Sequence, residues 1–405
     1  MSELTVRTVT RDELPAFIEV FQAAFLNDVQ EGDVDWFGNE FVPANRFQGV
    51  YDDEELIGTA GILTRNMTVP GTGAVPFGGV TSVAVRPGHR RRGALTMMMR
   101  EQLHGMHEES REAFAGLWAS EGSIYGRFGY GMAAQAARVN VPKGTPFRPG
   151  VDLGETRVAD LPRAKAMPLI KELYARVSAQ RVGWLDRSED SWNMWLWDTP
   201  NRRGGSSALR FAVHPEGYVI FRTKRKWGDR GPEAELSVNE IVADTPVASA
   251  ALWRYLLDYD HVAEVEAQVA PDNPVTLMLA DPRQAQRRYI DSLWIRIVDV
   301  DRALPLRAYS APVDTVFELT DQFCPWNQGR WRLKAGEDGV ATVRRATQDP
   351  DLVLDVTDLG AAFLGGTRLT ELAAAGRVRE LTPGSLVAAS RAFTGDHAPH
   401  CPEVF

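Results

Sequence analysis

Three consecutive arginines and a glycine, Arg90, Arg91, Arg92 and Gly93, follow a β-branched run at residues 80–85 after a short Pro-Gly break. The run predicts a strand, and the apolar pattern beyond Gly93 predicts a helix. The start of a helix attracts anions through its free N–H groups and its dipole, and guanidinium groups bind phosphate oxygens in a forked geometry. Glycine lets a phosphate approach the backbone closely. We therefore expect a phosphate-binding turn here.

A segment crowded with aromatic and glycine residues follows a predicted buried strand at residues 113–118, and it contains Ser120, Tyr125 and Tyr130. A tyrosine phenol, with a reference pKa near 10, is a candidate proton donor. Tyr130 is the rival of Tyr125 for this role, and either ring can instead be a packing residue under the sheet. Ser120 has no evident histidine partner, so a catalytic triad is not predicted.

Phe25 ends an apolar stripe along a predicted helix and is followed by an acidic loop at residues 27–39, which contains Asp28 and Trp36. Such a loop is most often only solvated. Aromatic faces and carboxylates also attract cations, which is what a polyamine site requires. Both interpretations of the loop stay open at this point.

The length, charge and cysteine content of the chain limit the classes of protein to which it can belong. The chain has 405 residues, of which 44% are hydrophobic, a length that suggests two to four domains. Its net charge of −9 argues against a nucleic-acid-binding protein. Two cysteines give no disulfide framework, so a reducing cytoplasm is expected. We expect neither a signal peptide nor a membrane-spanning segment, because no apolar run approaches about 20 residues.

The strand–turn–helix arrangement recurs at residues 236–259, which predicts a second domain of similar fold. Thr245 and Pro246 fit the cap and the first position of its helix. This turn contains neither glycine nor arginine, and Asp244 would repel a phosphate. The second domain is therefore predicted to lack the phosphate-binding site.

Three segments together resemble the Eis family of GCN5-related N-acetyltransferases (GNAT enzymes): the Arg-x-x-Gly turn, the Ser-Glu-Gly-x-Ile-Tyr-Gly-Arg-Phe-Gly-Tyr-Gly run at residues 120–131, and the Leu-Trp-Ile-Arg-Ile run at residues 293–297. The resemblance implies an α/β (α+β) fold with tandem GNAT-like domains and a C-terminal α+β domain that resembles sterol carrier protein. The three domains are expected at residues 1–145, 146–292 and 293–405.

The same resemblance implies an N-acetyltransferase that takes acetyl-CoA as co-substrate and forms a homo-oligomer, a hexamer. The implied acceptors are amines of aminoglycoside-like polyamines. Two alternatives stay open, namely a protein-lysine acetyltransferase and a lipid- or ligand-binding protein with vestigial GNAT domains.

The resemblance also assigns roles to individual residues. Tyr125 matches the catalytic tyrosine, and Phe25, Asp28 and Trp36 match the region of the amine-binding pocket. The residues implied in binding acetyl-CoA are Val83, Ala84, Val85, Arg90, Arg91, Arg92, Gly93, Ala94, Leu95, Thr96, Ser120 and Glu121.

The last residues of the chain are unusually apolar for a free tail, with Pro402 stiffening the approach to Val404 and Phe405. The resemblance implies that the α-carboxylate of Phe405 reaches the active site of the first domain as general base. Glu403 is a competing base, and a frayed tail of no consequence is the third interpretation. No metal site is predicted, because the histidines and cysteine near the end have no second cluster of ligands.

Overall fold

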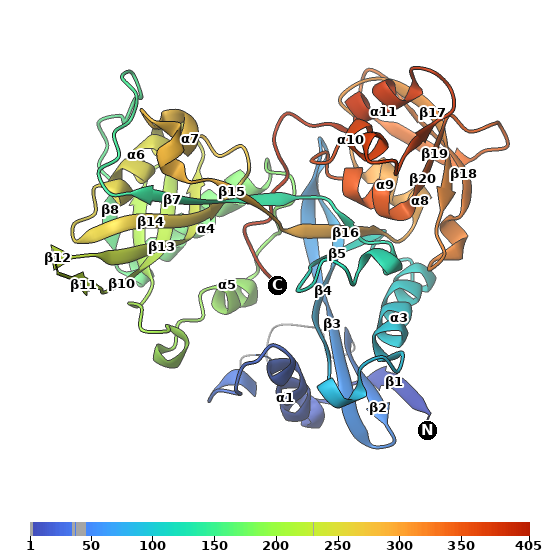
Figure 1. Ribbon diagram of the computed structural model, residues 1–405, viewed down its shortest axis with the longest axis horizontal. Coiled ribbons are helices and arrows are strands. Elements are labelled where there is room, and N and C mark those ends of the chain that lie inside the picture. The colour runs from blue at the N-terminus through green and yellow to red at the C-terminus, as the bar shows by residue number, and fades with distance from the viewer. Residues whose placement is uncertain (1–2, 35–36, 38–45, 230) are drawn as a thin grey trace.

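The computed structural model describes residues 3–34, 37, 46–229 and 231–405. Trp36, the aromatic residue expected in the amine pocket, lies outside the described residues. Within them, the strands form two seven-stranded sheets, one five-stranded sheet and a small two-stranded ribbon. Figure 1 shows the three larger sheets in three lobes, with the last residues of the chain running between the lobes.

The first sheet carries the predicted phosphate-binding turn. Its strands lie in the order β1 (Leu4–Thr8), β2 (Phe47–Asp52), β3 (Glu55–Val69), β4 (Gly73–Val85), β5 (Phe114–Trp118), β16 (Leu293–Ile297) and β6 (Gly131–Met132). Helices α1 (Leu14–Ala24) and α3 (Ala94–Glu108) pack against it. The apolar residues of α1 and α3 lie in core clusters with residues of β2, β3 and β4, as the helical spacing of the sequence predicts.

The second sheet repeats this plan. Its strands lie in the order β8 (Ala159–Leu161), β9 (Arg210–His214), β10 (Gly217–Lys224), β13 (Ala234–Ala243), β14 (Val262–Val269), β7 (Gln135–Pro142) and β15 (Arg288–Asp291). Its helices are α4 (Arg163–Ser178), α5 (Glu189–Trp195), α6 (Pro246–Leu257) and α7 (Val275–Met278), and the ribbon consists of β11 (Trp227–Gly228) and β12 (Gly231–Pro232). The Thr245 hydroxyl accepts a hydrogen bond from the Ala248 N–H at 3.2 Å, so the predicted cap of α6 is confirmed.

The two sheets exchange strands. β7 leaves the first domain and pairs with β14 of the second sheet, whereas β16 returns and pairs with β5 of the first. Sheet membership therefore differs from the predicted domain limits of 145/146 and 292/293: β7 belongs to the second sheet, and β16, which was expected to open the third domain, belongs to the first. Pairing between strands far apart in sequence decides this, and no local pattern carries it.

In each of the two seven-stranded sheets, one parallel pair of strands separates part-way along its length. β4 and β5 pair at Gly78–Ala115 and Gly79–Gly116, where their ladder stops, while β4 continues to Val85. A register shift against β3, with Ser82 at φ 54°, lies in this continuing part of β4. β13 likewise continues to Ala243 after its ladder with β14 stops. The separation frees backbone hydrogen-bonding groups at the gap.

The third domain is a five-stranded sheet in the order β19 (Ala341–Arg345), β18 (Gly329–Ala335), β17 (Val313–Thr320), β20 (Leu352–Asp355) and β21 (Arg379–Glu380). Its helices are α8 (Val300–Ala303), α9 (Val356–Ala362), α10 (Leu369–Ala374) and α11 (Ser385–Phe393). α9 packs on β16 and β6, and one apolar core runs continuously from the first domain into the third.

The contact between α9 and β6 supplies a stability test. A Cβ atom added at Gly131 would overlap the carbonyl oxygen of Thr357 and the backbone nitrogen of Ala361, neither of which can rotate away. Gly131→Ala is expected to lower the free energy of unfolding by about 3 kcal/mol, the upper end for overpacking. Gly105→Ala in α3, where nothing lies within 4 Å of the added atom, should instead stabilise by about 0.5–1 kcal/mol. Urea unfolding of both variants checks this, and equal stabilities would contradict it.

Candidate functional site

A cavity of about 680 Å³ lies in the first domain, beside the separated end of β4. Its walls come from the end of α1, the end of β4, the turn before α3 and the segment after β5. The residues predicted from the sequence that line it are Phe25, Val83, Ala84, Val85, Arg90, Arg91, Gly93, Ala94, Leu95, Thr96, Ser120, Glu121 and Tyr125. Four lining residues were missed, namely Ala24, His89, Ile124 and Arg127. Ala24, His89 and Ile124 each adjoin a predicted residue in sequence and Arg127 lies two positions after Tyr125, which was the available signal.

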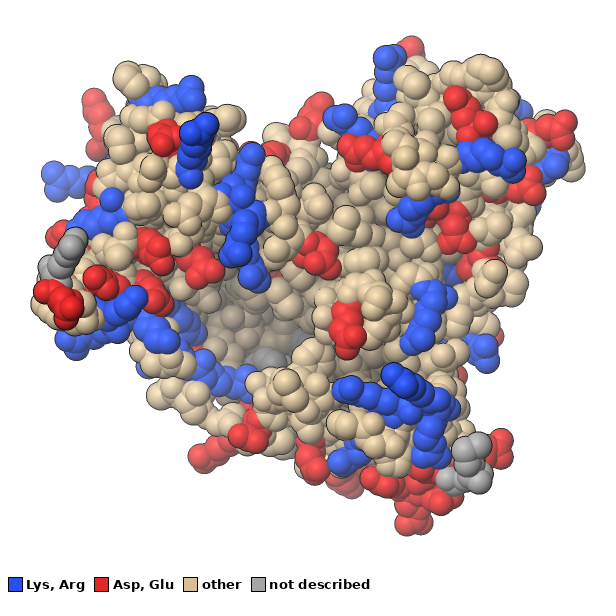
Figure 2. All heavy atoms as spheres, viewed as in Figure 1, with Lys and Arg blue, Asp and Glu red and all other residues tan. Residues whose placement is uncertain are grey.

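The turn before α3 has the geometry of an anion site. Gly93 is the N-cap of α3 with φ 94°, and Arg91 also has a positive φ of 63°. These conformations bring the backbone of Gly93, Ala94 and Leu95 to the cavity wall at the helix start, where N–H groups are free. Figure 2 shows Lys and Arg side chains gathered over the start of α3. The turn thus combines a helix start with nearby positive charge, the two features that attract an anion.

Arg92 differs from its neighbours, because it does not line the cavity. Its Nη1 atom lies 2.5 Å from Asp52 Oδ2 and 2.9 Å from His89 Nδ1. The hydrogen bond to Asp52 raises the pKa of Arg92 above its ordinary value. Arg92 thus ties the turn to the end of β2, whereas the sequence alone suggested a phosphate ligand.

The two tyrosines of the aromatic segment differ in their access to the cavity. Tyr125 lines the cavity, and burial, followed by the charge of Glu121, raises its pKa to about 12, so the phenol is protonated at neutral pH. Tyr130 is fully buried, and its hydroxyl has no hydrogen-bond partner among the described residues. The rings lie 5.9 Å apart, edge to face. Tyr130 therefore packs against Tyr125, and of the two tyrosines Tyr125 is the one that lines the cavity.

The predicted amine-binding residues at the end of α1 and in the acidic loop differ in their relation to the cavity. Phe25 lines it with 43% of its surface exposed, whereas Asp28 is exposed and does not line it. Asp33, another acid of this loop, is 1% exposed. Its carboxylate accepts hydrogen bonds from Gln22 and from Arg202 of the second domain. Asp33 thus anchors the loop across the two domains.

Phe405 lies at the base of the gap between β4 and β5. Its ring contacts Gly79, the last residue of β4 that pairs with β5, and stands edge to face with Phe77 at 5.9 Å. Phe405 also packs against the cluster that contains the core residues of α1. The end of the chain is therefore packed into the first domain, although Phe405 does not belong to the lining of the cavity itself.

Within the described part of the chain, no group of three or more His, Cys, Asp or Glu residues is arranged to hold a metal ion. Of the helices described, none has the length and apolar character needed to cross a membrane.

Comparison with known proteins agrees with this architecture. Residues 5–133 and residues 183–297 each match the acetyltransferase (GNAT) domain, and residues 300–402 match the sterol carrier protein domain. An uncharacterised N-acetyltransferase of Streptomyces avermitilis is 39% identical, over 99% of both chains. The N-acetyltransferase Eis of Mycobacterium tuberculosis is 32% identical, over 97% of both chains.

The crystal structure of Eis1 from Mycobacterium abscessus matches with a TM-score of 0.85 at 31% identity, covering 99% of this chain and 100% of that one. The chain belongs to the Eis family of GNAT N-acetyltransferases. The predicted order of two GNAT domains and a sterol-carrier-like domain is confirmed. Membership of the family implies an acetyltransferase with acetyl-CoA as co-substrate.

The arginines of the turn allow a matched comparison. Arg91→Ala is expected to weaken acetyl-CoA binding by about 1.5–3 kcal/mol, roughly tenfold or more in Kd, because a charged hydrogen bond to phosphate is lost. Arg92→Ala should weaken binding less, since its guanidinium is bound to Asp52. Calorimetric titration measures both. A larger loss in Arg92→Ala than in Arg91→Ala would contradict the placement of these side chains.

Proposed function

We propose that this protein transfers the acetyl group of acetyl-CoA to a primary amine of a polycationic small molecule of the aminoglycoside type. The observation that carries the proposal is the cavity at the β4–β5 gap, which brings an anion-binding helix start, a free strand edge and a protonated tyrosine together. These are the parts that acyl transfer from a diphosphate-bearing thioester requires.

The binding roles follow from the chemistry of each wall. Arg90, Arg91 and the N–H groups at the start of α3 bind the diphosphate. Val83 to Val85 offer backbone groups to the pantetheine arm, and this edge of β4 polarises the thioester carbonyl. Ser120 and Glu121, on the opposite wall, complete the slot. The walls are polar where a phosphate would lie and apolar towards Ile124 and Phe25, which fits a molecule with a charged end and a slender arm.

The reaction requires one proton donor and one proton acceptor. Acetyl-CoA supplies a thioester whose carbonyl carbon is attacked by the amine, so that a C–N bond forms and the C–S bond breaks. Tyr125 donates its proton to the leaving sulfur. The α-carboxylate of Phe405 accepts the proton of the attacking amine, directly or through water. An α-carboxyl has a reference pKa of about 3.3–3.7 and is a weak base in water, so partial desolvation beside Phe77 would assist it.

The groups of the lining that attract a cationic acceptor are Glu121 and the aromatic face of Phe25, with Asp28 on the loop that follows Phe25. The arginines of the lining, Arg90, Arg91 and Arg127, suit the anionic co-substrate instead. A lysine side chain carries the same ammonium group, so the test must compare an aminoglycoside with a peptide as the acceptor. Release of coenzyme A thiol should be measured with an aminoglycoside, a lysine-containing peptide and a buffer blank. The proposal expects the largest kcat/KM with the aminoglycoside. Preference for the peptide would overturn the acceptor class, and absence of turnover with any amine would overturn the proposal.

Tyr125 and Tyr130 provide a matched pair of variants. Tyr125→Phe should lower kcat by roughly a hundredfold or more, because the proton donor is lost, with acetyl-CoA binding unchanged. Tyr130→Phe removes a buried hydroxyl that has no partner among the described residues, so kcat should stay within about twofold of the wild type. Steady-state kinetics of both variants test the assignment, and a larger defect in Tyr130→Phe would reverse it.

The terminal carboxylate is tested by changing where the chain ends. Deletion of Phe405, or extension by two glycines, moves or removes the carboxylate and should lower kcat by roughly a hundredfold. Acetyl-CoA binding should not change, because Phe405 does not line the cavity. Normal turnover in both chains would exclude the terminal carboxylate as the base.

A further inference from the structure

The tail after α11 is irregular but deeply buried. Residues 394–405 form no helix or strand, yet His400, Cys401 and Glu403 are each at most 5% exposed. The His400 N–H donates to the Val182 carbonyl oxygen at 3.0 Å, which ties the tail to the second domain. Figure 1 shows the tail passing from the third domain between the other two. A segment buried without regular structure must be held by specific contacts.

The first of these contacts uses the gap of the second domain. A cavity of about 260 Å³ lies between the separated ends of β13 and β14 at the start of α6, the position that corresponds to the acetyl-CoA cavity of the first domain. Tail residues Ala398, His400 and Pro402 form part of its wall. Asp244, at the equivalent turn, pairs with Arg176 at 2.6 Å. The gap that serves a cofactor in one domain thus serves the tail in the other.

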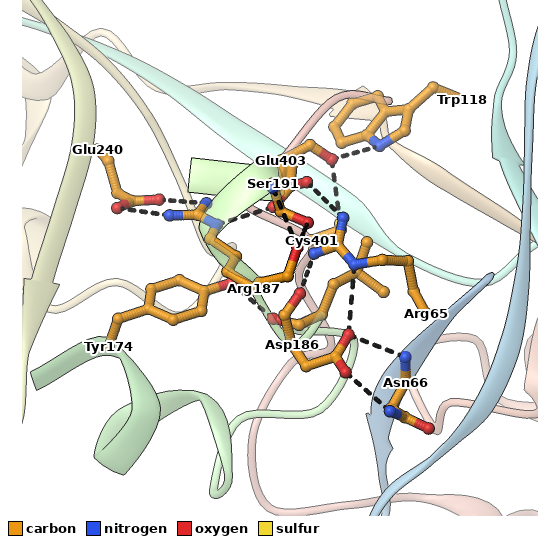
Figure 3. Close-up of polar contacts among 12 residues, drawn as sticks. Arg65, Asn66, Trp118, Tyr174, Asp186, Arg187, Ser191, Glu240, Cys401 and Glu403 are labelled. Carbon is orange, nitrogen blue, oxygen red and sulfur yellow. Dashed lines mark hydrogen bonds and ion pairs between the residues drawn. The ribbon is translucent and has the colours of Figure 1, made fainter. Parts of the chain in front are cut away.

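The second contact is a buried ion network around Glu403, drawn in Figure 3. Its carboxylate oxygens lie 3.0 Å from Arg65 Nη1 and 2.8 Å from Arg187 Nε. Arg187 also forks onto Glu240, at 2.7 and 3.1 Å. The side chains of Arg187 and Glu403 are fully buried, and that of Arg65 is 8% exposed. Two cations therefore balance two anions, with Asp186 adding a half-exposed partner to Arg65.

The network joins the first and second domains. Arg65 lies on β3 of the first domain, and Glu240 lies on β13 of the second. The guanidinium of Arg187 lies 4.0 Å from the ring centre of Tyr174 and 4.5 Å from that of Trp192. On its backbone side, Glu403 accepts a hydrogen bond from Trp118 Nε1 of β5 at 2.9 Å. Glu403 is thus held by its side chain and by its carbonyl group at once.

This environment gives Glu403 a role other than proton transfer. Burial alone would raise the pKa of its carboxyl, but the charges of Arg187 and Arg65 outweigh burial and hold that pKa below its ordinary value. Both carboxylate oxygens already accept from arginines. Glu403 is therefore ionised, and arginines already contact both of its carboxylate oxygens. This makes it a poor general base and a firm anchor for the tail.

We infer that Glu403 is a positioning residue that sets the place of the Phe405 carboxylate. Glu403 lies two positions before Phe405. Because an extended chain spans roughly 3.3–3.6 Å per residue, the anchor lies within about 7 Å of the chain end. Val404 between them is 55% exposed and adds no comparable hold. Loss of the anchor lets the end of the tail move relative to β4. The inference rests on the proposed function, in which that carboxylate is the base.

The test is Glu403→Gln in the full-length chain, which keeps the shape of the side chain and removes its charge. For this variant we expect kcat to fall by roughly tenfold to a hundredfold, with KM for acetyl-CoA unchanged. Carboxypeptidase A should also release phenylalanine from this variant several times faster than from the wild type. Val404→Ala and Asp314→Asn, which removes an exposed ion pair to Arg332 in the third domain, serve as controls and should change neither quantity.

A second variant covers the case in which Glu403→Gln fails to fold. Arg65→Lys keeps the positive charge beside Glu403 and leaves the Arg187–Glu240 pair intact, so it should fold and show smaller shifts in the same directions. Wild-type kcat and wild-type phenylalanine release in both variants would overturn the inference. The release assay does not depend on catalysis. If deletion of Phe405 leaves turnover normal, the proposed base fails, while faster release from Glu403→Gln still supports the anchoring of the tail.

Discussion

The separation of β4 from β5 is the constraint on which the rest of the site depends. A parallel pair that stayed together to the end would satisfy its own backbone groups and leave no gap. Because the ladder stops at Gly79 and Gly116, one edge of β4 is available to a ligand, and α3 begins directly beyond it. The helix start, Tyr125 and the ring of Phe405 are arranged around this opening. The gap therefore places the anion-binding turn, Tyr125 and the end of the chain around one backbone irregularity.

The second domain shows the same irregularity with a different use. β13 and β14 also separate, but the turn beside them carries Asp244 in place of arginine and glycine. An acidic side chain disfavours a diphosphate, whereas a peptide segment brings no such charge to the turn. Duplication of the fold thus supplied two openings, of which one retains an anion-binding turn and the other borders the tail.

Local sequence was enough to predict features that depend on near neighbours. The Thr245 cap and the glycine turn before α3 each follow from a few adjacent residues, and both are present. Most of the residues predicted to bind acetyl-CoA do line one cavity, because a strand, a turn and a helix keep them together. The family resemblance supplied the order of the domains, which composition and length alone only bounded.

Features that depend on distant partners escaped prediction. Arg92 has the same residue type as its neighbours, and only the proximity of Asp52 turns it away from the cavity. Asp33 lies in the acidic loop, and neither interpretation of that loop included its pairing with Arg202 of the second domain. Arg65 and Glu403 are separated by 338 positions, and no periodicity relates them. The exchange of β7 and β16 is of the same kind.

That exchange has a consequence for the order in which the protein is made. Chains emerge from the ribosome from the N-terminus, and domains generally fold as units when their residues are available. The first sheet cannot be completed when its own helices and strands have emerged, because β16 follows the whole second domain in the chain. Until then, β5 exposes an unpaired apolar edge, a type of edge that favours aggregation. Closure of the first sheet must therefore wait for translation of the second domain. The first and second domains are thus a single unit during synthesis as well as in the folded structure.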